Sequence, residues 1–166
     1  MTKIGTKTAN QPAANRRGPA GNASSLYYIP RMPQALAHQY PIGIDPTDID
    51  FMGHVNNASY LKWVQEAVIS HWKKLAPPEA VAAHLWVALK HEITYRKPTF
   101  LDDDVIATVL LEKVQGARAF YETVIRRGEE VLAEVKSSWC CLDARTLRPA
   151  RLAKDVIERF FPKQGR

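Results

Sequence analysis

The sequence of 166 residues predicts an α+β fold in which one five-stranded antiparallel sheet wraps around a single long helix. Three observations predict this fold. The expected elements follow the order strand, helix and then four strands. The helix is apolar on most of its sides, and the four strands after it alternate between apolar and polar residues. A sheet can bury such a helix only when it curls around it. The chain length suits one domain.

The first strand is expected over residues 37–44, a short and apolar-rich segment. The long helix is expected over residues 57–75, and either Asn56 or Asn57 can cap its start, because a short side-chain oxygen accepts from the free N–H groups there. The prolines at 77 and 78 end it. Its apolar residues recur at helical spacing, namely Tyr60, Leu61, Trp63, Val64, Ala67, Val68, Ile69, Trp72 and Leu75.

Four alternating segments follow the helix and predict an antiparallel meander. Pro98 ends the first of them, and Gly116 and the pair Gly128–Glu129 mark turns between the later ones. A last amphipathic segment, residues 155–161, predicts a short helix. The strands themselves are expected over residues 85–95, 104–114, 118–127 and 131–142.

The composition is that of a soluble globular domain, with 46% hydrophobic and 24% charged residues. Residues 1–25 have no periodic apolar face, so we expect a disordered tail there and a domain over residues 26–166. No apolar run approaches the roughly 20 residues of a membrane span, and no signal-peptide core follows Met1. A membrane partner is therefore not expected.

The formal net charge of +6 favours anionic partners. Nucleic acid is not expected among them, because the sequence has no arginine-rich helix and no aromatic ribonucleoprotein signature. Cys140 and Cys141 are adjacent, and neighbours in a strand point to opposite faces, which makes them poor disulfide partners. No cysteine–histidine cluster indicates a metal site. We therefore expect a cytoplasmic protein without metal or redox cofactor.

Residues 48–63, DIDFMGHVNNASYLKW, resemble the signature of the hotdog thioesterase superfamily. The form of this stretch is similar to that of acyl-carrier-protein thioesterases, and the wider pattern is similar to that of 4-hydroxybenzoyl-CoA thioesterases. The run ITYRKPTFLDDDV at residues 93–105 matches as well, and the resemblance covers residues 40–152. It implies the hotdog fold and a hydrolase of fatty acid metabolism that cleaves acyl-CoA or acyl-carrier-protein thioesters.

The resemblance also implies roles for individual residues. The catalytic carboxylate of the benzoyl-CoA branch falls on Asp50, and the helix-start amide that polarises the thioester carbonyl falls on Asn57. In the plant branch an aspartate and a histidine are implicated, which fall on Asp50 and His54, but the asparagine between them is Met52 here. Some members instead use a glutamate of the helix, and Glu66 competes with Asp50 for this role.

Elementary chemistry supports the same stretch. Thioester hydrolysis needs a nucleophile or an activated water and a donor for the developing oxyanion. Asp50 lies seven residues before the expected helix start, whose free N–H groups carry partial positive charge. Gly53 allows a positive φ or a close approach to a ligand. Asp50 could attack the carbonyl directly or act as a base toward water, and the sequence leaves both open. Asp48 is assigned a structural role.

Three basic residues are candidates for binding the phosphates of coenzyme A. Arg118 begins a strand after the Gly116 turn, at a position that resembles the basic cluster of CoA-specific members. Arg96 and Lys97 precede Pro98. Charge-assisted contacts to phosphate suit such side chains, although each residue can equally be a solvated strand end.

The resemblance implies a homodimer or homotetramer in which two sheets pair edge to edge and the site lies between the subunits. Pairing would also cover a long exposed edge strand. Two other classes stay open at this stage. A hotdog dehydratase or hydratase would use a different His/Asp pairing, and a non-catalytic module would bind an acyl-CoA or a carrier protein without turnover.

Overall fold

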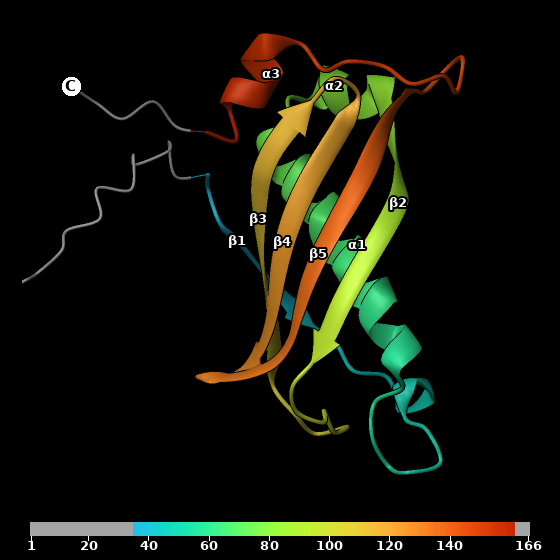
Figure 1. Cartoon of the computed structure of the whole chain (residues 1–166), viewed down its shortest axis with the longest axis vertical. Coiled ribbons are helices and arrows are strands. Elements are labelled where there is room, and N and C mark those ends of the chain that lie inside the picture. Colours follow the sequence, from blue (N-terminus) through green and yellow to red (C-terminus); the bar gives the residue numbers. More distant parts are fainter. Residues whose placement is uncertain (1–34, 162–166) are drawn as a thin grey trace, which may run out of the picture. The chain divides into compact units, whose positions relative to one another are not determined.

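The computed structural model describes residues 35–161, which belong to the compact unit Arg31–Arg166. The tail expected over residues 1–25 lies outside the described residues. Figure 1 shows the elements in chain order. They are β1 (His38–Ile42), the 3-10 helix η1 (Pro46–Asp48), α1 (Asn57–Leu75), α2 (Pro78–Ala83), β2 (His84–Tyr95), β3 (Val105–Gln115), β4 (Arg118–Arg127), β5 (Glu130–Asp143) and α3 (Lys154–Glu158).

The five strands form one antiparallel sheet in the order β1-β3-β4-β5-β2. The strands β3, β4 and β5 form an antiparallel meander, and their turns contain Gly116 and Gly128, both with positive φ. The prediction that all four strands after the helix share one meander is wrong. β2 does not join this meander beside β3. It pairs with β5, so that the loop of residues 96–104 crosses from one side of the sheet to the other (Figure 1). The expected five-stranded sheet around one helix is confirmed.

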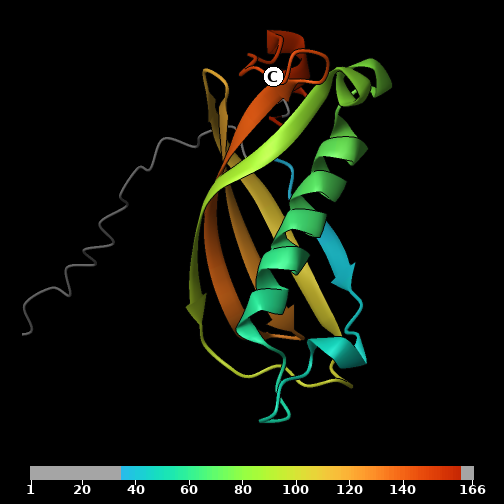
Figure 2. The same cartoon turned by 90° about the vertical axis from the view of Figure 1, so that its right-hand side faces the viewer.

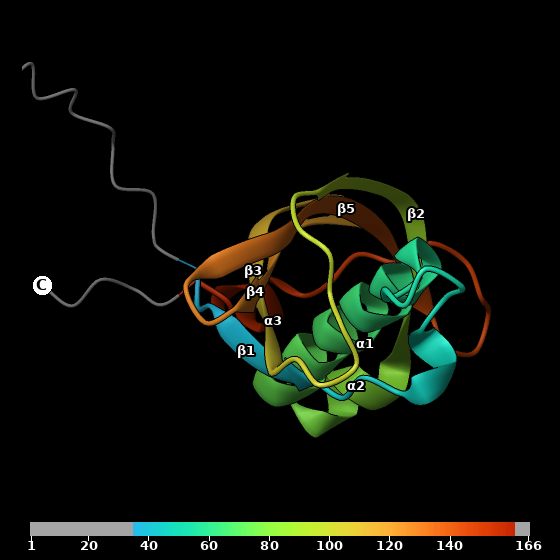
Figure 3. The same cartoon turned by 90° about the horizontal axis from the view of Figure 1, so that it is seen from below.

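The helix α1 lies along the inner face of the curved sheet. Figure 2 shows it running the length of the strands, and Figure 3 shows the sheet bending around it. Its bounds match the predicted ones, with Asn56 as the cap, because the asparagine side chain accepts from Ala58 N at 2.8 Å. One stripe of the helix is buried against the sheet, comprising Tyr60, Trp63, Val64, Ala67, Val68, His71 and Trp72.

Large aromatic side chains fill the space between α1 and the sheet. Trp63 and Trp139 are fully buried, and Trp72 stacks on Phe160 with ring centroids 5.9 Å apart. A buried aromatic side chain contributes several times the apolar area of an alanine, so these rings dominate the core. They fix α1 against the sheet and thereby fix the position of its N-terminus.

Two short helices differ from the sequence expectation. The prolines end α1 as predicted, but Pro78 also begins α2, since proline is accepted in the first turn of a helix where no N–H bond is lost. α3 covers Lys154–Glu158 and ends before the expected residue 161, although Val156 and Phe160 are both buried. Within residues 35–161 no helix is long and apolar enough to span a membrane.

Candidate active site

Asp50 lies in a tight loop between η1 and α1. An isolated bridge between Ile49 and Val55 closes this loop, and Asp50 N donates to His54 O at 2.8 Å. Gly53 adopts a φ of 77°, a conformation that other residues rarely accept. The Asp50 carboxylate accepts from Met52 N at 2.8 Å and more weakly from His54 N at 3.4 Å. The loop therefore holds the carboxylate in one orientation.

Asp48 anchors the base of the same loop. Its buried carboxylate accepts from Asp45 N and from the Ser59 hydroxyl, both at 2.9 Å, and its carbonyl accepts from Asn56 N at 2.7 Å. These bonds join η1 to the first turn of α1. Buried polar groups are satisfied in this way when they serve the fold, which agrees with the structural role that we expected for Asp48.

A cavity of about 380 Å³ opens beside this loop and the N-terminus of α1. It brings together five of the eight predicted site residues, from the loop, the helix start and the end of β2. Its lining consists of Asp50, Met52, His54, Val55, Asn56, Asn57, Tyr60, Tyr95, Arg96, Lys97 and Pro98. The N–H groups of Ala58 and Ser59 in the first turn are already bound to Asn56, so the N–H group of Asn57, at the start of α1, is the one placed to meet negative charge.

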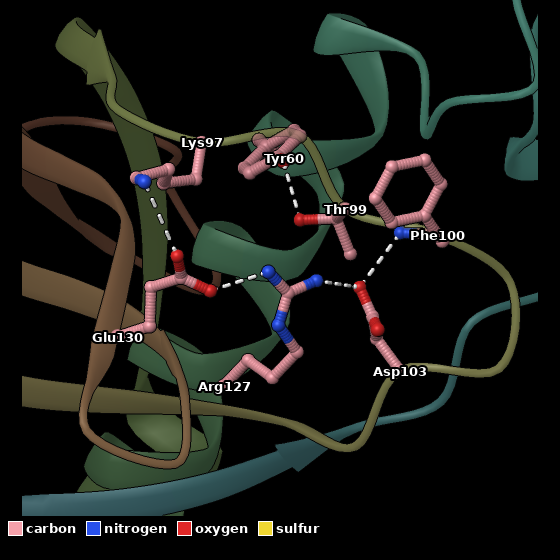
Figure 4. Close-up of polar contacts among 7 residues, drawn as sticks. All are labelled: Tyr60, Lys97, Thr99, Phe100, Asp103, Arg127 and Glu130. Carbon is pink, nitrogen blue, oxygen red and sulfur yellow. Dashed lines mark hydrogen bonds and ion pairs between the residues drawn. The ribbon is translucent and has the colours of Figure 1, made fainter.

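The loop of residues 96–104 forms the opposite wall of the cavity. Val55 N donates to Thr99 O at 2.8 Å, and the hydroxyls of Tyr60 and Thr99 are 2.6 Å apart (Figure 4). The ring of Phe100 meets the His54 ring edge to face, with centroids 5.3 Å apart. The run of residues 93–105 therefore packs against residues 48–63, and the two motifs together enclose the site.

Two tyrosines of the cavity were not predicted as site residues. The Tyr95 hydroxyl donates to Asn57 O at 3.0 Å, and its ring meets that of Tyr60 at 5.1 Å. Burial raises the pKa of both phenols, so that each keeps its proton at neutral pH and can donate a hydrogen bond. Tyr60 carried a signal, since it follows Asn57 by one helical turn, but its apolar spacing indicated core packing.

Glu66 does not lie at this cavity. The apolar residues of α1 predicted a helix that is buried on most of its sides. This prediction is wrong, because α1 is buried along one stripe and Glu66 is exposed outside that stripe. It follows Asn57 by nine residues, which is about 13 Å along the helix axis. Glu66 lines a different cavity of about 610 Å³, together with Tyr40, Lys62, Gln65, Ile69, Ser70 and Lys73.

Arg118 and Gly53 also stay outside the cavity lining. Arg118 begins β4 and pairs with Cys140, which pairs with Val87 near the start of β2. The cavity adjoins the other end of β2, at Tyr95, so Arg118 lies at the opposite end of the sheet within one chain (Figure 1). Gly53 is part of the loop that shapes the site. Among residues 35–161 no group of histidine, cysteine or acidic side chains is arranged to hold a metal ion.

The arrangement combines the parts that acyl hydrolysis needs. A carboxylate, an imidazole and the N-terminus of α1 line one cavity, together with two cations, Arg96 and Lys97. The carboxylate can activate water or attack a carbonyl carbon, and the helix N-terminus can stabilise an oxyanion. Both cations are already paired, Arg96 with Glu134 and Lys97 with Glu130, so a phosphate-bearing leaving group would compete with these carboxylates for them.

Comparison with known proteins agrees with this chemistry. A family model described as the thioesterase-like superfamily matches residues 44–160. The long-chain acyl-CoA thioesterase FadM of Escherichia coli (strain K12) is 29% identical over 119 residues, which are 68% of this chain and 88% of that protein.

Solved structures share the fold. A thioesterase from Thermus thermophilus, complexed with coenzyme A and Zn, matches with a TM-score of 0.64 and 24% identity over 74% of this chain and 95% of its own. A probable thioesterase from Bartonella henselae matches with a TM-score of 0.62 and 26% identity over 72% of this chain and 99% of its own.

The sheet, its central helix and the site at the helix start define a hotdog-fold thioester hydrolase. The chain belongs to the thioesterase-like superfamily, whose family model covers most of its length.

Proposed function

We propose that this chain hydrolyses acyl-CoA to a free acid and coenzyme A, with Asp50 as the residue that carries the chemistry. The observation that supports this most is the cavity itself, which joins the Asp50 carboxylate to the N-terminus of α1. The likeness to the E. coli long-chain acyl-CoA thioesterase supports coenzyme A as the carrier. The cytoplasm is the proposed location. The alternative substrate is the acyl thioester of a carrier protein.

In the proposed reaction the thioester carbonyl oxygen points to the first turn of α1, near Asn57. Asp50 acts in one of two ways. As a base it takes a proton from water, and the resulting hydroxide attacks the carbonyl carbon. As a nucleophile it forms a mixed anhydride, which water then opens. In both cases the C–S bond breaks, the thiolate leaves with the electron pair, and it takes up a proton. His54 lines the same cavity and is the proposed source of that proton.

The substrate is tested by thiol release from acyl-CoAs of short, long and aromatic acyl groups. We expect turnover, with the highest kcat/KM for long chains because of the likeness to FadM. The same acyl groups on pantetheine report the contribution of the nucleotide phosphates. Turnover of acyl-carrier protein alone would assign the other carrier, and thermal stabilisation by coenzyme A without any turnover would contradict hydrolysis.

The two roles of Asp50 are separated by adding borohydride during a single turnover. An anhydride at Asp50 is reduced to an alcohol, and mass spectrometry of the Asp50 peptide detects the change. An unmodified peptide at full turnover supports the role of Asp50 as a base.

We also propose that two chains pair through β2. This strand lies at one edge of the sheet, and Leu85, Val87 and Leu89 on it are 46%, 45% and 50% exposed. Such an apolar edge is a liability unless another strand covers it. Antiparallel pairing about a twofold axis would bring the start of the partner's β2 to the end of this one. Arg118 of the partner subunit would then approach the cavity that Arg118 of the same chain does not reach.

The molar mass of the protein, measured by light scattering after size-exclusion chromatography, tests this pairing. We expect a dimer or a tetramer for the wild type and a monomer for the double variant Val87→Asp/Leu89→Asp, with a loss of turnover. Leu36→Asp is the matched control, because Leu36 is 42% exposed and precedes β1, the strand at the opposite edge of the sheet. A wild-type monomer with full turnover would contradict the pairing.

A further inference from the structure

A cluster of four charged side chains lies beside the cavity, where the loop of residues 96–104 meets the β4–β5 hairpin (Figure 4). Arg127, the last residue of β4, is at its centre. Its Nη1 donates to Asp103 Oδ2, and its Nη2 donates to Glu130 Oε2. Glu130 also pairs with Lys97. The side chains of Arg127 and Asp103 are 30% and 16% accessible, whereas those of Lys97 and Glu130 are 57% and 38% accessible, so the cluster is more exposed on its Lys97 side.

One arm of the cluster leads to His54. The Asp103 oxygen that accepts from Arg127 also accepts from Phe100 N at 2.8 Å. This bond fixes the backbone at Phe100, whose ring meets the His54 ring at 5.3 Å. A displacement of Asp103 would therefore move the ring against which His54 packs.

The other arm leads to Lys97. Glu130 uses its second oxygen, Oε1, to hold Lys97 Nζ at 3.4 Å. The backbone on both sides is bound as well, because the N–H groups of Arg96 and Lys97 both donate to Leu132 O. Lys97 lines the cavity. Glu130 binds the Lys97 ammonium group and is itself bound by Arg127, so Arg127 influences the position of the ammonium group.

The geometry of a guanidinium suits both arms at once. Its donors lie in one plane on a rigid fork, and each side can bind a separate carboxylate. A lysine at this position would offer one ammonium centre for two acceptors that lie on different segments. Arg127 itself does not line the cavity, so it does not touch the place where substrate is expected.

We propose that Arg127 is a positioning residue of the active site, which holds Lys97 through Glu130 and His54 through Asp103 and Phe100. The kinetic part of this inference rests on the proposed hydrolysis of acyl-CoA. The structural part does not, because the positions of His54 and Lys97 can be followed without any turnover.

Nuclear magnetic resonance of the protein labelled with ¹³C-histidine follows the His54 arm. The chain has five histidines, and His54→Gln assigns the resonance of interest. Phe100→Leu removes the ring beside His54 and gives the reference change in the His54 chemical shift. We expect Arg127→Gln and Asp103→Asn to move the His54 resonance in the direction of Phe100→Leu. Glu130→Gln, on the other arm, and Arg126→Gln, the matched control on the same strand, are expected to leave it in place.

Steady-state kinetics separates the two arms. Glu130→Gln removes the partner of Lys97, so we expect KM for acyl-CoA to rise roughly two- to fivefold, the range of an exposed ion pair. KM for acyl-pantetheine, which lacks the nucleotide phosphates, should stay constant. Asp103→Asn disturbs His54, so kcat should fall roughly tenfold or more with both substrates, because small misplacements of a catalytic group are costly. Arg127→Lys should show both defects, and Arg126→Gln neither.

The inference is overturned if Arg127→Gln and Arg127→Lys keep the wild-type His54 resonance and both wild-type kinetic constants. Should Arg127→Gln fail to fold, Asp103→Asn and Glu130→Gln decide, since each removes one arm only. If the wild type cleaves no thioester, the proposed function fails while the His54 resonance still decides the role of Arg127. A uniform loss of activity with an unmoved His54 resonance would assign the cluster to stability alone.

Discussion

The hydrogen bond between Tyr60 and Thr99 joins the start of α1 to the far wall of the cavity, and its removal should be costly. The two hydroxyl oxygens are 2.6 Å apart, and the residues are 2% and 0% exposed. Tyr60→Phe would leave the Thr99 hydroxyl buried without its partner. A buried polar group left unsatisfied costs about 1–3 kcal/mol. For a chain of this size each kcal/mol lowers the melting temperature by about 2–4 °C.

The bond is isolated by a double-mutant cycle of Tyr60→Phe, Thr99→Val and both together. Urea unfolding followed by tryptophan fluorescence gives the free energy of unfolding for each. Each single variant should lose about 1–3 kcal/mol. The double variant should lose less than the sum, because it leaves neither hydroxyl unpaired. Tyr40→Phe, at a half-buried tyrosine on β1, is the control and should change stability by less than about 0.5 kcal/mol. Additive losses would refute the reasoning.

Two further predictions concern stability. Burial and the neighbouring His38 lower the pKa of His71 to about 4. Below pH 6.5 the unfolded chain therefore binds a proton at His71, and the native chain does not until the pH approaches 4. The free energy of unfolding thus falls as the pH drops from 6.5 toward 4, and the contribution of His71 to this loss is roughly 2 kcal/mol at pH 5. In urea unfolding at pH 7.5 and 5, His71→Phe should show a smaller loss than the wild type, and an equal loss would contradict this. Gly53→Ala should destabilise the protein by about 1–2 kcal/mol, because Gly53 has a φ of 77°. No atom lies within 4 Å of the added methyl group at Gly53 or at Gly43. Gly43 has no positive φ, so Gly43→Ala should leave the stability unchanged. Equal melting temperatures of the two variants would contradict the strain.

Local signals in the sequence determine much of this fold. The bounds of α1 follow from an asparagine cap, a helical apolar spacing and the prolines after it. The strand segments follow from their alternation. The place of β2 beside β5 does not, because alternation determines which face a residue occupies but not which strand lies next to it. The exposure of Glu66 was missed for a similar reason, since apolar residues surround it in sequence while the sheet covers only one stripe of the helix.

The site was predictable where one short motif builds it. Asp50, His54 and Asn57 belong to a single loop and helix start, and they share the cavity. The contacts of Phe100 and Arg127 were not predictable, because they join segments far apart in the chain. Asp103 and Arg127 are 24 residues apart, and Tyr95 and Asn57 are 38 apart. The crossing of residues 96–104 brings Phe100 to His54 and Asp103 to Arg127, and the end of β2 brings Tyr95 to Asn57.

The most direct test of the account is the turnover of a saturating long-chain acyl-CoA by Asp50→Asn. Asp155→Asn is the matched control, because Asp155 is an exposed aspartate in α3, outside the cavity. With equal melting temperatures, the account predicts a fall in kcat of about a hundredfold or more for Asp50→Asn, the usual loss when an acid–base group is removed, and wild-type turnover for the control. Wild-type turnover by a folded Asp50→Asn would contradict the account and would assign the chemistry to His54, the other titratable side chain of the loop at the cavity.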